Sequence, residues 1–123
     1  MARSTSFTDI APIFPVADVR AALDHYRALG FRTAPYEDGD DYGFAELGQV
    51  HLHLTYRPSS YYPEGGFAVA YLAVQDADAL YAAWSHPGVG GSTQQPADMP
   101  WRMHEGVHTD PDGNIIRFGS PAT

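Results

Sequence analysis

Polar and aromatic side chains that could contact a small molecule alternate with apolar residues in two neighbouring stretches. In a β-strand such alternation puts each set of side chains on its own face. We expect the apolar set to pack against a helix and the other set to line one wall of a cavity: Tyr42, Phe44, Glu46, His51, His53 and Thr55. Rings suit a flat heteroaromatic ligand, because each offset-stacked pair contributes roughly 0.5 to 1.5 kcal/mol beyond area burial. Alternatively, Tyr42 and Phe44 are ordinary sheet-face residues that close a dimer.

Trp101 and Arg117 supply further candidates in the last quarter of the chain. Trp101 follows Met-Pro and precedes a strand signal, where an indole can lie across the mouth of a cleft and stack on a ligand. The other interpretation is a core or interface tryptophan, which is what helical spacing predicts for Trp84. Arg117 alternates with apolar residues, so its guanidinium can pair with an acid such as Glu46 or Glu105, or donate to a ligand carbonyl.

Tyrosines beside turns form a second group of possible contacts. Tyr36 precedes the acidic run EDGDD, residues 37–41, while Tyr61 and Tyr62 lie in a Pro-, Ser- and Gly-rich stretch. Each ring could close over a bound molecule, although tyrosines are common in turns. The acidic run could meet cationic groups of a ligand, but we favour a solvated hairpin turn.

Four histidines invite comparison with a metal site. His51 and His53 share one strand face, and His104 and His108 share another. Residues two apart on a strand are separated by roughly 6.6 to 6.8 Å, and no third ligand is evident, so we predict hydrogen-bonding histidines. The motifs of serine hydrolases, P-loops and dinucleotide-binding sites do not occur, which leaves covalent and phosphoryl-transfer chemistry without support.

Composition narrows the class of partner. The 123 residues predict a single domain, 1–123, and cysteine is absent, which excludes disulfides and thiolate metal sites. Fifteen acids against seven bases, all of them arginine, give a formal charge of −8. Such a field repels nucleic acid and attracts cations. No apolar run approaches the ~20 residues of a membrane span, and we expect a cytoplasmic protein without nucleic-acid or membrane partners.

The order of predicted elements repeats across a central linker. The first module, 1–57, reads as a strand at 7–16, a helix capped by Asp18 and ended at Gly30, and strands at 31–36, 42–47 and 49–56. Pro12 and Pro15 argue that the first strand is an edge or a crossing arm. Residues 58–66 are the linker.

The second module, 67–123, follows the same order. It reads as a strand at 67–74, a helix capped by Asp76 that carries Trp84, and strands at 91–95, 101–109 and 114–119. The turn DPDGN, residues 110–114, joins the last two strands, because its proline, Asx side chain and glycine favour chain reversal. The fold class is therefore α+β, with two βαβββ modules that form a curved half-barrel. One helix covers one face of each sheet, so the concave face becomes the ligand cavity.

Three segments together resemble the vicinal oxygen chelate superfamily, which includes glyoxalase I, fosfomycin-modifying enzymes, extradiol dioxygenases and bleomycin resistance proteins. They are PVADVRAALDHYRALGF, VQDADALYAAW and DPDGNIIRF, at residues 15–31, 74–84 and 110–118. In metal-dependent members the ligands lie on the concave face, at positions that correspond here to Ala11, His53, Val69 and Arg117. Only His53 could bind a metal, since alanine and valine lack donor atoms and guanidinium stays cationic. The resemblance thus implies the fold without its metal chemistry, without a cofactor and without catalysis.

Within the superfamily the chain looks like the bleomycin-resistance type. That resemblance implies a homodimer with two crevices between subunits, each sequestering one glycopeptide antibiotic without chemical change. It also implies that a ring at Tyr42 and a hydroxyl at Thr55 touch the ligand. A metal such as copper arrives with the drug. Two alternatives stay open: a metal-dependent lyase, thiol transferase or dioxygenase using His53 and unorthodox ligands, or a binder of another aromatic natural product.

Overall fold

The structure, a computed structural model, describes residues 4–57, 66–86 and 88–123 and contains the two predicted βαβββ modules. The elements of the first module are β1 (Ile13–Val16), α1 (Val19–Ala28), β2 (Arg32–Pro35), the short 3-10 helix η1 (Tyr36–Asp38), β3 (Tyr42–Leu47) and β4 (Val50–Tyr56). Those of the second are β5 (Val69–Ala73), α2 (Ala77–Trp84), β6 (Ser92–Asp98), β7 (Met103–Thr109) and β8 (Ile115–Pro121). Tyr61 and Tyr62 lie outside the described residues. No described helix has the length and apolarity needed to cross a membrane.

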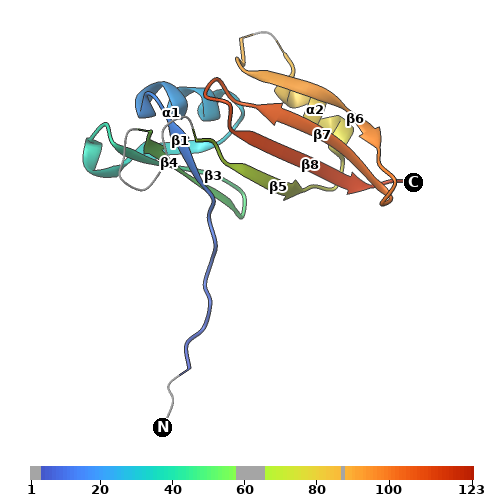
Figure 1. The fold of residues 1–123 in the computed structure, drawn as a ribbon, viewed down its shortest axis with the longest axis horizontal. Helices are drawn as coiled ribbons and strands as arrows, with labels where there is room; N and C mark the ends of the chain where they lie inside the picture. The colour runs from blue at the N-terminus through green and yellow to red at the C-terminus, as the bar shows by residue number, and fades with distance from the viewer. Residues whose placement is uncertain (1–3, 58–65, 87) are drawn as a thin grey trace.

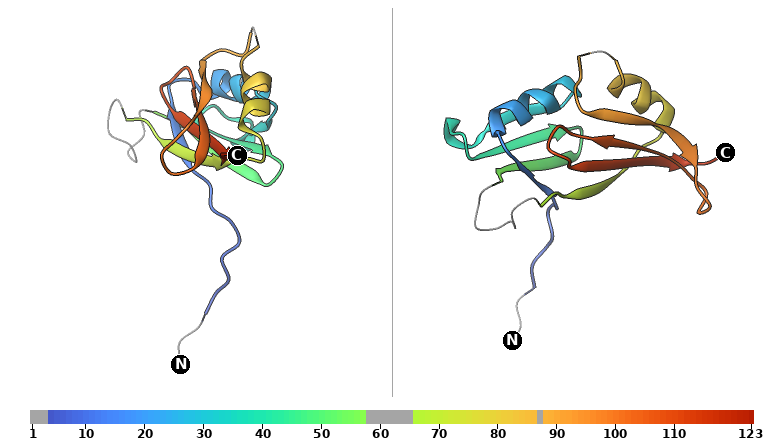
Figure 2. Two further views of the ribbon diagram at one scale, coloured as in Figure 1. Left: turned by 90° about the vertical axis from the view of Figure 1, so that its right-hand side faces the viewer. Right: turned by 45° about the horizontal axis from the view of Figure 1, so that its top comes forward.

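Each module forms one open, four-stranded mixed sheet. The strand order is β1-β4-β3-β2 in the first sheet and β5-β8-β7-β6 in the second. In each sheet the first strand pairs in parallel with the last strand of its module, and the remaining pairs are antiparallel. Both helices lie on one side of the sheets (Figures 1 and 2). The opposite side of each sheet, which we call its open face, is left uncovered by helices.

Both helices begin, and α1 ends, where the sequence predicts. The carboxylates of Asp18 and Asp76 accept hydrogen bonds from backbone N–H groups three residues later, at 3.0 Å in both cases. Gly30 follows the C-cap of α1 with a φ of 106°, a conformation that costs glycine little because it has no Cβ.

Two strands differ from their predicted bounds by more than two residues at one end. The prediction of a strand from residue 7 was wrong for residues 7–12, because β1 begins at Ile13 and the preceding arm extends away from the body (Figure 1). Pro12 lacks an N–H for a ladder, and the side chains of Phe7 and Ile10 are 97% and 89% exposed. Strand β6 is longer than predicted, since its register shifts between Gln94 and Ala97 and so accommodates Pro96 on an edge strand.

Both modules contribute to a single hydrophobic core on the helix side. Phe14, Tyr26 and Leu54 of the first module belong to the same buried cluster as Trp84 and Phe118 of the second. The indole N–H of Trp84 donates to the carbonyl of Leu29 at 3.0 Å, which links the two helical segments. The prediction that Trp84 is a core residue is confirmed.

Two residues of the DPDGN turn, Asp110 and Asn114, are buried at the junction of the modules. One carboxylate oxygen of Asp110 accepts from the backbone N–H groups of Asp112 and Asn114, each at 2.9 Å. The other accepts from the Tyr26 hydroxyl at 2.8 Å and from the Asn114 amide at 3.0 Å. Gly113 supplies the left-handed residue of the turn, with a φ of 89°.

The same turn reaches the backbone on either side of it. The Asn114 amide donates to the Pro15 carbonyl and accepts from the Ala68 N–H, both at 2.9 Å. The Asp112 carboxylate accepts from the Ala17 N–H at 2.9 Å. The DPDGN sequence predicts only a chain reversal, but its residues also form hydrogen bonds that connect the turn to β1, α1 and the segment leading into β5.

Replacing Asp110 by alanine removes four acceptor contacts and leaves the Tyr26 hydroxyl and the Asn114 backbone N–H buried without that acceptor, while the Asn114 side-chain amide keeps the Pro15 carbonyl. We expect Asp110→Ala to lower the free energy of unfolding by about 3 kcal/mol, and Tyr26→Phe by about 1 kcal/mol. Urea unfolding measures both. Asp24→Ala is the matched control, because Asp24 makes only an exposed ion pair with Arg27, and it should change stability by less than about 0.5 kcal/mol. Equal losses in Asp110→Ala and Asp24→Ala would contradict the proposed role of the turn.

A buried pair of histidines makes a second link between the modules. The His25 ring donates from Nδ1 to the Val89 carbonyl at 3.0 Å, so its Nε2 accepts from His108 Nε2 at 2.9 Å. The remaining His108 nitrogen, Nδ1, lies 2.7 Å from the Thr93 hydroxyl. Burial, followed by the neighbouring His25, lowers the pKa of His108 from its usual 6.5 to about 4, and burial also lowers that of His25.

A base whose pKa falls on folding stabilises the native state above its unfolded pKa and loses that contribution as the pH drops. For His108 the loss runs from about pH 6.5 down to about pH 4 and amounts to about 3 kcal/mol. Urea unfolding across this range should therefore show a shallower decline in His108→Gln than in the wild type. Parallel pH profiles would contradict the buried neutral pair.

Candidate functional site

The open face of the first sheet carries the side chains that alternation predicts. Across β2, β3 and β4 the register aligns Ala34 with Phe44 and His53, and aligns Arg32 with Glu46 and His51. Leu52 and Leu54, which alternate with the histidines, are buried against the helix side. The predicted facing of both strands is confirmed, and it produces one aromatic row beside one polar row.

Four rings pack edge to face along the aromatic row. Phe44 lies between His53 and Tyr36, with ring centroids 5.1 and 6.4 Å away. The Tyr42 hydroxyl hydrogen-bonds to His53 Nδ1 at 2.8 Å, which fixes both rings. Tyr36 remains 53% exposed, so a flat ligand could contact its face. Thr55 is aligned with Tyr42 but is buried, which leaves little of its hydroxyl for a ligand.

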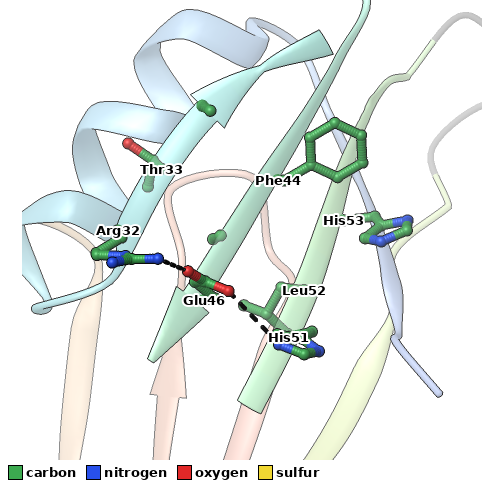
Figure 3. Close-up of a pocket in the computed structure, with 9 residues that line it drawn as sticks. Arg32, Thr33, Phe44, Glu46, His51, Leu52 and His53 are labelled. Carbon is green, nitrogen blue, oxygen red and sulfur yellow. Dashed lines mark hydrogen bonds and ion pairs between the residues drawn. The ribbon is translucent and has the colours of Figure 1, made fainter. Parts of the chain in front are cut away.

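The polar row is a chain of ionic contacts. Glu46 pairs with Arg32, and His51 lies 3.6 Å from Glu46 (Figure 3). His51 also hydrogen-bonds to Asp9 of the N-terminal arm. The hydrogen bond from His51 holds the pKa of Asp9 below its usual value. Residues of both rows line a hollow of about 360 Å³ over β2, β3 and β4: Phe44 and His53 from the aromatic row, and Arg32, Glu46 and His51 from the polar row.

The acidic run between β2 and β3 is an exposed turn, as predicted. Arg20 of α1 donates to the Asp38 carbonyl at 2.7 Å and to the Asp40 carboxylate at 3.1 Å. Glu37 and Asp38 adopt positive φ angles of 48° and 58°, which are unusual for residues other than glycine. Arg20 thus holds a strained turn whose first residue is Tyr36.

The open face of the second sheet is organised around Glu105 on β7. Its carboxylate accepts from the Trp101 indole N–H and the Tyr71 hydroxyl, both at 2.8 Å, and from the Arg117 guanidinium at 2.7 Å. The hydrogen bond from Trp101, followed by those from Tyr71 and Arg117, holds the pKa of Glu105 below its usual value. Of the two acids suggested as partners for Arg117, the structure selects Glu105, while Glu46 pairs with Arg32.

The predicted site residues fall into two groups on different sheets. Tyr36, Tyr42, Phe44, His53 and Thr55 lie on or beside the first sheet. Trp101 and Arg117 belong to the second, where the connection from β6 to β7 is at the end remote from the first sheet (Figure 1). The hollow over the first sheet includes no residue of the second. One copy of the chain therefore carries the predicted residues in two groups, on or beside the open faces of two sheets.

Two of the four histidines considered for a metal site belong to the helix side instead. His108 is buried in the core, and both ring nitrogens of His104 face carboxylates, Asp98 at 2.7 Å and Asp78 at 2.9 Å. These two contacts, led by that with Asp78, raise the pKa of His104. The prediction of hydrogen-bonding histidines is confirmed.

The donor set does not fit the metal of the superfamily that the sequence resembles. Of the four corresponding positions, Ala11, Val69 and Arg117 offer no ligand atom, and His53 is hydrogen-bonded to Tyr42. In the part of the chain that the structure describes, no three His, Cys, Asp or Glu side chains gather as a metal ion requires.

Sequence reasoning missed Tyr71 and gave Glu105 only a secondary place. Tyr71 lies in the predicted strand FAVAYLAV, whose other residues are apolar. Its hydroxyl, at an alternating position of that strand, is the signal that could have identified Tyr71 as a site residue. Its ring is half-exposed on the open face and reaches over Gly119 of β8 to Glu105 of β7. Side-chain reach across two strands is not visible in a linear pattern.

Comparison with known proteins gives one family. The sequence profile of the Glyoxalase/Bleomycin resistance protein/Dioxygenase superfamily matches residues 9–118. A search among curated proteins found no match.

Several solved structures share the fold. The bleomycin-binding protein from bleomycin-producing Streptomyces verticillus, complexed with copper(II)-bleomycin, is 22% identical with a TM-score of 0.76, and the alignment covers 95% of this chain and 98% of that one. TnmS3, an antibiotic binding protein from Streptomyces sp. CB03234, is 24% identical with a TM-score of 0.73, over 97% and 100% of the two chains. A glyoxalase-related enzyme from Clostridium phytofermentans is 18% identical with a TM-score of 0.74, over 98% and 99%.

Proposed function

The chain belongs to the glyoxalase/bleomycin resistance protein/dioxygenase superfamily, and from that membership we propose that it sequesters a bleomycin-family glycopeptide antibiotic without modifying it. The superfamily name covers enzymes as well as resistance proteins, so the choice between them depends on the site. The observation that carries the proposal is a set of half-exposed aromatic rings on both open faces, Tyr36 and Phe44 on the first and Tyr71 and Trp101 on the second.

The donor atoms on the open faces support binding rather than catalysis. Arg117 stands where the resemblance places a metal ligand, and its guanidinium already pairs with Glu105. The protein itself then needs no cofactor, and a metal such as copper enters as part of the drug. The complex of the Streptomyces verticillus relative with copper(II)-bleomycin supports a ligand of this kind.

The two groups of residues support a homodimer in which each crevice is shared and each group is a half-site. The first sheet of one copy supplies Tyr42 and Phe44, and the second sheet of the other supplies Trp101 and Arg117. The exposed apolar side chains of the N-terminal arm, Phe7 and Ile10, favour contact with another copy. The cytoplasm is the proposed location.

Sequestration requires a dissociation constant below the toxic drug concentration. Micromolar binding corresponds to about −8.2 kcal/mol, which stacking, apolar burial and attraction of a cation by the acidic protein could supply after the cost of association. The net charge of −8 acts on a cationic drug before contact and so favours a fast association rate.

Titration with copper-bound bleomycin should quench the fluorescence of Trp101, and Trp101→Ala should weaken binding by about tenfold or more. Trp84→Phe is the matched control, because the Trp84 indole is buried in the core. Calorimetry gives the affinities independently of fluorescence. Equal affinity in Trp101→Ala and the wild type would remove Trp101 from the site, and absence of any binding would overturn the proposed ligand.

Shared crevices can be tested by mixing two defective variants. Phe44→Ala and Trp101→Ala homodimers each carry a defect in both crevices, whereas a mixed dimer has one intact crevice and one with both defects. After random subunit exchange about a quarter of all crevices should regain wild-type affinity. Calorimetry of the mixture measures this fraction. No recovery, in a mixture shown by mass to contain mixed dimers, would place both residues in a crevice of one copy.

A different aromatic cargo is the second candidate, favoured by the tyrosine-rich lining and by the antibiotic-binding relative TnmS3. A thermal-shift screen of antibiotics separates the two, since a ligand at 100 times its dissociation constant adds about 2.7 kcal/mol to stability.

A further inference from the structure

The Glu105 cluster on the open face of the second sheet is built from three strands and one connection. Tyr71 comes from β5, Glu105 from β7, Arg117 from β8, and Trp101 from the connection between β6 and β7. The Glu105 side chain is only 3% exposed although it stands on the uncovered face, because the residues that donate to it also cover it. Each donor is thereby fixed relative to the other two.

Gly119 of β8 makes the arrangement possible. A Cβ built at this position would lie 2.1 Å from the Tyr71 hydroxyl oxygen and 3.0 Å from Glu105 Cγ. Any other residue would therefore push the Tyr71 ring off β8 and away from Glu105. The glycine is a packing requirement of the cluster, since its φ is not in the left-handed region.

The hydrogen bonds decide what the cluster can still offer to a ligand. The Tyr71 hydroxyl and the Trp101 indole N–H both donate to Glu105, so these two side chains present ring faces rather than polar hydrogens. Arg117 donates from one Nη to Glu105 and is 42% exposed. A guanidinium carries five N–H donors, so it keeps several for an acceptor on a ligand.

We propose that Glu105 is the positioning residue of this half-site, holding Tyr71, Trp101 and Arg117 as one platform for a planar aromatic group that carries an acceptor oxygen at its edge. The inference rests on the proposed function only in taking the open face as a ligand site. The rings supply stacking faces, and the exposed charge of the platform is the positive Arg117, because the negative Glu105 is covered.

The first sheet presents the opposite charge on its open face. Its polar row holds two exposed acids, Glu46 and Asp9, against one exposed arginine, Arg32, with side chains 40%, 49% and 85% exposed. A ligand with a cationic end and an acceptor-bearing aromatic end would therefore meet complementary charge on both half-sites. The platform would bind the aromatic end of such a ligand.

Three naphthalene probes of the same ring size test the selection. They are 2-naphthoate, 2-naphthylmethylammonium and 2-methylnaphthalene, titrated into the full chain and followed by the indole N–H cross-peaks in ¹H–¹⁵N spectra. We expect 2-naphthoate to shift the Trp101 peak with the highest affinity of the three. The Trp84 peak, from an indole bonded to the Leu29 carbonyl in the core, is the internal reference and should stay in place. Preference for the cationic probe, or no shift of the Trp101 peak by 2-naphthoate, would overturn the proposal.

Arg117→Gln and Arg32→Gln form a matched pair. Each removes one positive charge from an arginine that pairs with a glutamate on an open face, and glutamine at 117 can still donate to Glu105. We expect Arg117→Gln to weaken 2-naphthoate binding by about tenfold and Arg32→Gln to leave it within about twofold. Equal effects of the two substitutions would mean that the net charge of the protein alone determines the affinity for 2-naphthoate, and would overturn the role of Arg117.

Substitutions at Glu105 and Tyr71 separate positioning from simple electrostatics. Removing a carboxylate should tighten binding of an anion if charge alone matters, whereas Glu105→Gln should weaken it if Glu105 positions the platform, since one amide oxygen cannot serve three donors. Tyr71→Phe keeps the ring but loses its tie to Glu105, and it should weaken 2-naphthoate by about threefold. Unchanged or tighter binding in both variants, with the Trp84 peak in its native position, would overturn the positioning role.

These outcomes are independent of the drug titration. If copper-bound bleomycin fails to bind while 2-naphthoate shows the expected preferences, the platform is supported and the proposed drug ligand is contradicted. If the drug binds but the three probes bind with equal affinity, the proposed function is supported and the selection by Arg117 is contradicted.

Discussion

A buried carboxylate at the junction of the two modules is the constraint on which the rest of the structure depends. Asp110 sits among four hydrogen-bond donors, and burial of a charge is tolerable only when its lone pairs are satisfied in this way. Because one of those donors is Tyr26 on α1, the hydrogen bonds of the turn between β7 and β8 are complete only when the first module is in place. Asn114 adds the same condition for β1 and the approach to β5. Neither module closes its core without the other.

This arrangement keeps the structural hydrogen bonds on the helix side and leaves the open faces for other contacts. His25 and His108, Trp84 and the buried residues of the DPDGN turn all lie where the helices and sheets meet. The rings on the open faces contribute less to the core, and their exposed fractions show that they are not needed to close it. Aromatic surface of this kind on an uncovered sheet favours a binding role, since large exposed apolar patches are uncommon in proteins that act alone.

Local signals in the sequence predicted most of the fold. Asp18, Asp76 and Gly30 mark the helix ends through capping chemistry, and strict alternation in residues 42–56 assigned each side chain of two strands to its correct face. The errors have physical causes. The run from Phe7 contains strand-forming residues, but residues 7–12 pair with no strand among the described residues, and β6 continues past Pro96 because a register shift accommodates it. The assembly of the half-sites was beyond pattern reading, because Tyr71 reaches Glu105 only where Gly119 leaves room across an intervening strand.

The hydrogen bonds of Glu105 bear on whether the open face of the second sheet could hold a catalytic metal. A carboxylate binds a metal through lone pairs that are free, yet those of Glu105 receive an indole N–H, a phenol and a guanidinium. Arg117, at a position where the superfamily places a ligand, repels a cation and also occupies the one buried acid nearby. A metal site on this face would thus require more than one substitution, because breaking the hydrogen bonds to Glu105 would also leave the Trp101 and Tyr71 side chains unfixed. The same contacts that fix the aromatic platform therefore favour binding over turnover on this face.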